Sequence, residues 1–122
     1  MMNKNKDILE RTKAFALRII RLYTALPKST EAQVIGKQVL RSGTSVGAHV
    51  REGKRSRSDA ELVSKIEGGL QELEETVYWL ELLVDSGIVK AEHMAELLKE
   101  ADELISILVS SVKTVKQRSK KK

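Results

Sequence analysis

The side chains best placed for chemistry are four basic residues near the middle of the chain, Arg51, Lys54, Arg55 and Arg57. Positive charges packed this closely, just before a helix-start signal at Ser58, suit contact with phosphate groups. Ser56 and Ser58 add further hydrogen-bond donors. A second basic group lies at the C-terminal end, and both groups predict binding to RNA or DNA. The C-terminal basic group consists of Lys116, Arg118, Lys120, Lys121 and Lys122.

An alternative is a solvated turn whose arginines pair with acidic residues later in the chain. Charge is indeed segregated along the sequence. Residues 1–57 carry 13 basic and 4 acidic residues, residues 58–112 carry 3 and 13, and residues 113–122 carry 6 and none. The two halves of the chain are therefore expected to attract each other, within or between subunits. Aromatic residues make up only 3% of the chain, which argues against a stacking platform for single-stranded nucleic acid.

Enzymatic chemistry has little support in the sequence. The chain has no cysteine, which excludes thiolate metal sites and disulfides. Its two histidines, His49 and His93, lack the glutamate three positions earlier that marks a di-iron bundle. A phosphate-binding loop is also missing. We therefore expect no enzyme, no cofactor and no metal site.

Four helices are predicted from hydrophobic periodicity. They cover about 5–26, a segment starting at Thr30, a segment starting at Ser58, and about 90–116. Thr30 with Gln33, and Ser58 with Glu61, fit capping boxes, and a left-handed C-cap is expected at Gly87. The third segment carries a heptad-like seam. The seam residues are Leu62, Ile66, Leu70, Leu73, Val77, Leu80 and Val84.

Short connections between these segments favour an all-α, antiparallel, up-down-up-down four-helix bundle. The bundle is predicted as one domain over residues 1–116, followed by a basic, disordered tail over 117–122. No secretion signal and no apolar run of membrane-spanning length is visible, so a cytoplasmic protein with no membrane partner is expected.

Small residues in the second segment need a reason, because each glycine costs a helix roughly 1 kcal/mol relative to alanine. Gly43, Gly47 and Ala48 are predicted to let a neighbouring helix or subunit approach closely. His49 is expected to be a packed polar residue that hydrogen-bonds across a helix pair, a contact at a subunit interface or a pH-sensitive switch. Apolar residues off the main stripes predict a homo-oligomer. These are Ile20, Leu22, Val63, Trp79 and Leu83.

The order of these motifs resembles the small bacterial four-helix-bundle proteins related to the ribosomal RNA intervening-sequence proteins. In that family an Ala-Asn-hydrophobic-x-Glu core precedes a basic, serine-containing turn, and a long helix follows with a Leu-x-Glu element and an aromatic residue. The counterparts here are 46–52, the turn 53–58, Leu73 with Glu72 or Glu74, and the pair Tyr78–Trp79. "LPKST" resembles the family's first interhelix turn, and the resemblance covers about 19–112. His49 replaces the usual asparagine.

The resemblance implies a left-handed bundle assembled as a ring-like homopentamer. Some members are encoded within inserts of large-subunit ribosomal RNA genes, and relatives in retroelements bind nucleic acid and a reverse transcriptase. The resulting hypothesis is a non-enzymatic homo-oligomer that binds RNA or DNA through a basic rim. The alternative is a protein–protein adaptor whose acidic and basic surfaces recruit another protein, with no direct nucleic-acid role. The partners that the resemblance implies are RNA or DNA and a reverse transcriptase or other protein. A third interpretation, a toxin–antitoxin or other regulatory component, has no motif to support it.

Overall fold

The computed structural model describes the backbone of residues 4–120 and the side chains of residues 8–120, and this part of the chain contains four helices and no strand. The helices are α1 (Lys4–Ala25), α2 (Thr30–Lys54), α3 (Asp59–Asp85) and α4 (Ala91–Lys120). The all-α fold class predicted from the sequence is confirmed.

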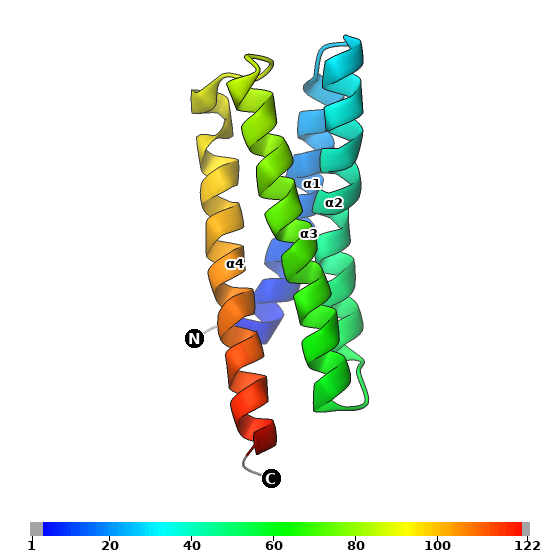
Figure 1. Cartoon of the computed structure of the whole chain (residues 1–122), viewed down its shortest axis with the longest axis vertical. Helices are drawn as coiled ribbons and strands as arrows, with labels where there is room; N and C mark the ends of the chain where they lie inside the picture. The colour runs from blue at the N-terminus through cyan, green and yellow to red at the C-terminus, as the bar shows by residue number, and fades with distance from the viewer. Residues whose placement is uncertain (1–3, 121–122) are drawn as a thin grey trace.

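The helices lie side by side along one long axis, and the connecting loops alternate between its two ends (Figure 1). Each helix packs against the next along the chain, and α1 also packs against α4, so the four helices enclose one core. This is the up-down-up-down order that short loops favour. The left-handed sense of the bundle stays a prediction.

Capping side chains fix the starts of α2 and α3. Ser58 caps α3 as predicted, because its hydroxyl accepts a hydrogen bond from the Glu61 N–H at 3.1 Å. The cap of α2 was predicted one residue too late. Ser29, not Thr30, adopts the extended backbone of an N-cap, and its hydroxyl accepts from the backbone N–H of the third helical residue. Gly87 has φ +80°, which confirms the left-handed turn after α3.

The C-terminal end of α4 corrects the predicted disordered tail. Residues 117–120 are helical, and Lys121 and Lys122 lie outside the described residues. Two contacts hold this end to α3. Arg118 donates to the Asp59 carboxylate at 2.7 Å, and the Ser119 hydroxyl donates to it at 2.8 Å. A basic sequence without hydrophobic periodicity is therefore helical here because tertiary polar contacts support it.

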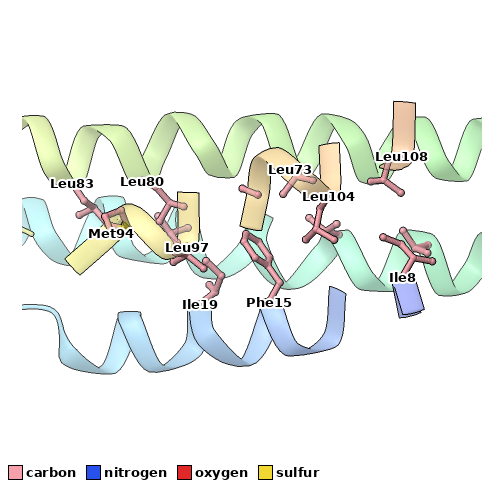
Figure 2. Close-up of a cluster of buried hydrophobic side chains, with 14 of the residues drawn as sticks. Ile8, Phe15, Ile19, Leu73, Leu80, Leu83, Met94, Leu97, Leu104 and Leu108 are labelled. Atoms are coloured by element: carbon pink, nitrogen blue, oxygen red, sulfur yellow. The ribbon is translucent and has the colours of Figure 1, made fainter. Parts of the chain in front are cut away.

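Large side chains from different helices meet along the bundle axis (Figure 2). Phe15 and Ile19 of α1, Leu73 of α3 and Leu104 of α4 are almost completely buried. The seam predicted for α3 is partly wrong. Leu70, Val77 and Val84 are only half-buried, whereas the core face carries Gly69, Thr76 and Leu83. Gly69 and Thr76 are small and face α2, which lies close to α3, whereas Leu83 is a large side chain buried in the core.

Candidate nucleic-acid interface

The candidate interface is the end of the bundle that holds the α2–α3 loop and the C-terminal turns of α4 (Figure 1). Arg51 and Lys54 lie in the last turn of α2. Arg55 is its C-cap, with its backbone N–H bonded to the Glu52 carbonyl at 3.1 Å, and Arg57 follows in the loop. All four side chains are exposed. We call this set the loop cluster.

The basic residues of α4 reach the same end but differ from the loop cluster in their partners. Lys116 lies 3.4 Å from a Glu67 oxygen, and both side chains are exposed. Arg118 makes a forked pair with Asp59, and this hydrogen bonding raises the pKa of the guanidinium. Lys120 is exposed. Since exposed pairs contribute little free energy, Lys116 remains accessible to a competing phosphate.

The loop cluster has no carboxylate partner within the described part of the chain. The alternative interpretation, in which its arginines pair with acidic residues of α3 and α4, therefore does not hold for these four residues. Their charges face solvent. Burial lowers the pKa of Lys54, the direction expected for an ammonium group that loses water without gaining an anion.

Opposite charges also pair farther along the bundle. Arg11 of α1 donates to Glu100 of α4 at 2.7 Å and to Glu103 at 3.1 Å. Arg41 of α2 reaches two glutamates of α3, and this hydrogen bonding lowers the pKa of Glu75. Some of the acidic residues of α3 and α4 are thus neutralised by basic residues of α1 and α2. The loop cluster has no such partner and adds positive charge to its end of the bundle.

Two of the residues predicted to allow close helix packing, Gly43 and Gly47, lie at a helix contact inside the chain. A Cβ on Gly43 would meet Ile19 of α1 at 2.8 Å, and a Cβ on Gly47 would meet Thr12 at 3.2 Å. The close neighbour of both glycines is therefore α1 of the same chain. Ala48 is exposed.

His49 packs across the α2–α3 contact. Its ring lies over Gly68, where an added Cβ would come within 3.0 Å of the ring. Its Nδ1 is buried and has no hydrogen-bond partner among residues 8–120, and the nearest carboxylate oxygen, on Glu52, is 4.0 Å away. His49 therefore packs against α3, but the hydrogen bond predicted across the helix pair is not formed by its Nδ1 within residues 8–120.

Sequence reasoning missed two features of the α2–α3 contact. The pair Gly68–Gly69 provides the surface on which His49 lies, and a double glycine inside a long apolar helix was the available signal. The second feature is a buried hydrogen bond of 2.8 Å between the hydroxyls of Ser42 and Thr76. The spacing places Ser42 on the apolar face of its helix, but the sequence gives no signal that Thr76 is its hydrogen-bond partner.

Residues 4–120 contain no group of three metal-ligating side chains. None of the four described helices combines the length and apolar content needed to cross a bilayer.

These features define a class, that of small all-α bundle proteins with a cationic end. The profile of the family described as "23S rRNA-intervening sequence protein" matches residues 4–110. The chain belongs to this family.

A solved structure agrees with this assignment. The crystal structure of a protein with unknown function from the S23 ribosomal protein family of Bacteroides thetaiotaomicron is 35% identical in sequence. The match covers 91% of this chain and 99% of that one, with a TM-score of 0.86. A comparison with curated proteins gives no match.

Proposed function

We propose that this chain is a non-enzymatic bundle protein that binds RNA or DNA through its cationic end, chiefly by phosphate contacts. The observation that supports the proposal most directly is the loop cluster, four exposed cations without a carboxylate partner in the described residues. Phosphates give such charges a partner and release counterions on binding. Lys116 and Lys120 extend the same surface along α4.

The test is binding of a labelled structured RNA and a matched duplex DNA over a salt series. The variant Arg51→Gln/Arg55→Gln removes two charges of the loop cluster. Its matched control, Lys28→Gln/Lys37→Gln, removes two exposed charges near the opposite end of the bundle. A plot of log affinity against log salt has a negative slope. For duplex DNA, each phosphate that a variant no longer neutralises should make this slope shallower by about 0.9.

The expected result is a flatter slope for the loop-cluster variant and an unchanged slope for the control. Equal effects of the two variants would mean that net charge alone drives binding, which contradicts a located site. Absence of binding to either nucleic acid at physiological salt would reject the proposal.

We further propose that the protein is a homo-oligomer, with a homopentamer expected from the resemblance to the family. Leu83, one of the residues that suggested this, is in the core, whereas Ile20 is exposed. Leu17 and Ile20 form an apolar patch one turn apart on α1, 45% and 41% exposed. Such a patch favours a protein contact. The variant Leu17→Gln/Ile20→Gln should lower the mass measured by light scattering, whereas Val34→Gln on α2 should not.

The second candidate function, an adaptor for a reverse transcriptase or another protein, rests on the same apolar patch. It differs from the first in the salt series. An adaptor without a nucleic-acid role would bind neither probe. Binding to its partner protein would be lost in the Leu17→Gln/Ile20→Gln variant and kept in the loop-cluster variant.

A further inference from the structure

A pocket of about 540 Å³ opens at the cationic end of the bundle, and all four helices line it. Its floor is aliphatic and includes residues from each helix. The floor residues are Ile8, Val50, Leu62, Ile66, Ile107, Leu108 and Val115. No aromatic residue is among the described residues that line it. Pockets of this size, apolar inside with a few polar groups, are typical of small-molecule sites.

The pocket follows from unequal helix lengths. Arg11 of α1 pairs with Glu100 and Glu103 of α4, so these residues lie at the same level of the bundle. From this level the described part of α1 reaches Lys4, seven residues away, whereas α4 continues to Lys120. Figure 1 shows the start of α1 well short of the tip of α4 and the α2–α3 loop. Within the described residues, α2, α3 and α4 therefore surround a space that lies beyond the start of α1.

The rim of the pocket is cationic. Lys54, Arg57 and Arg118 line it together with a single acidic residue, Asp59. Arg118 and Ser119 already bind the Asp59 carboxylate. Lys54 and Arg57 have no carboxylate partner in the described residues, so their charges are available to a ligand. Hydroxyl groups complete the rim, from Ser56, Ser58, Ser110, Ser111 and Thr114.

We propose that this pocket binds an amphipathic anion with an unbranched aliphatic chain, of the medium-chain fatty-acid class. The chain would lie on the aliphatic floor, and the carboxylate would meet Lys54 and Arg57. An aliphatic floor suits a flexible chain better than a flat ring, because a ring gains most from stacking on aromatic side chains. An anion at the rim would also supply the partner that Lys54 lacks, and its pKa would rise toward the ordinary lysine value.

The experiment is calorimetric titration of the full chain with dodecanoate, below the concentration at which it forms micelles. The expected result is saturable binding of one molecule per chain. Lys54→Gln should weaken it about tenfold, the loss expected for one charge-assisted hydrogen bond. The matched control Lys113→Gln removes an exposed charge of α4 outside the pocket and should leave the affinity unchanged.

Two further measurements test the floor. Decanoate has two methylenes fewer and should bind about fifteenfold more weakly if both are buried. Ser111→Leu should block the chain, with circular dichroism confirming that the variant folds.

Absence of saturable binding would overturn the proposal, and so would equal affinities for Lys54→Gln and Lys113→Gln. This proposal does not depend on nucleic-acid binding. Arg51 and Arg55, the residues changed in that test, do not line the pocket, so each proposal can fail without the other.

Discussion

Gly43 is the residue of α2 whose replacement by alanine should most disturb the bundle. A Cβ at this position would lie 2.8 Å from Cγ1 and 3.0 Å from Cγ2 of Ile19. Ile19 is 0% exposed, and its β-branched side chain has few rotamers, so neither atom can move away easily. Gly36 faces an even shorter distance, 2.6 Å, but to the end of the flexible Leu26 side chain.

Two opposing effects determine the size of the change. Replacing a helical glycine by alanine gains about 1 kcal/mol of helix propensity. Overpacking a close-packed core costs about 1–3 kcal/mol. Because two buried γ atoms of Ile19 are too close, we expect the upper part of that range and a net loss of about 1–2 kcal/mol for Gly43→Ala. For a chain of this length the Tm should fall by roughly 5–10 °C.

Gly47→Ala is the matched control, one turn along the same helix and facing the same partner helix. Its Cβ would lie 3.2 Å from the Thr12 hydroxyl oxygen and 3.4 Å from Thr12 Cβ, a milder crowding whose cost is offset by the gain in helix propensity. We expect a stability close to that of the unmodified protein. Chemical denaturation at one fixed protein concentration measures both variants, because assembly makes stability concentration-dependent.

A double-mutant cycle with Ile19 checks the assigned contact. Ile19→Ala removes Cγ1 and Cγ2, so in that background Gly43→Ala should lose its penalty, with a coupling energy of about 0.5–3 kcal/mol. Ile19→Val keeps both γ carbons and should give no rescue. If Gly43→Ala proves as stable as Gly47→Ala, or if valine rescues as well as alanine, the argument from close packing is wrong.

Three more predictions concern the α2–α3 contact. Thr76→Val leaves the buried serine hydroxyl of α2 without its partner and should cost about 1–3 kcal/mol in a denaturant titration. Arg41→Gln should destabilise slightly at pH 7. The difference should disappear as pH falls below about 4.5, because the paired Glu75 has a lowered pKa in the folded chain and its contribution is lost on protonation. Gly68→Ala should displace the ring of His49, seen as shifted imidazole proton resonances, while unchanged resonances would contradict the packing described.

The sequence predicted the number, type and order of the helices because local signals determine them. Hydrophobic periodicity located each helix, and Ser58 and Gly87 marked two of the helix ends correctly. The error at α2 has a local cause as well. Ser29 and Thr30 are both good caps, and the side chain of Gln33 donates to the Pro27 carbonyl at 2.8 Å instead of completing a capping box.

The face of α3 was harder to predict, because apolar residues occur at neighbouring positions on the helix wheel. A pattern search prefers Leu70 and Val77 to their neighbours Gly69 and Thr76. In the structure Gly69 and Thr76 are buried instead. The close approach of α2 needs small residues, and Thr76 has a hydroxyl partner on Ser42. Interhelical distance is a tertiary quantity that periodicity does not contain.

In the candidate site, too, local features were predictable from the sequence and tertiary ones were not. Its loop cluster is contiguous in sequence and was predicted as a set. Whether a cation has a carboxylate partner depends on which helices meet, so the pairing of Arg118 with Asp59 was not predictable. The pocket depends on the lengths of α1 and α4 relative to each other, a property of the assembled bundle rather than of any segment.

The position of the basic residues allows a role other than nucleic-acid binding, and the structure separates the two. Cations in the last turn of a helix stabilise it through the helix dipole, and Arg51 and Lys54 lie in the last turn of α2. Arg55 and Arg57 lie beyond that turn, so the dipole does not account for them. The dipole term affects the free energy of unfolding, by about 0.3–1 kcal/mol per residue. Phosphate contact affects the salt dependence of binding, so Arg55 and Arg57 are the residues at which the two roles differ most.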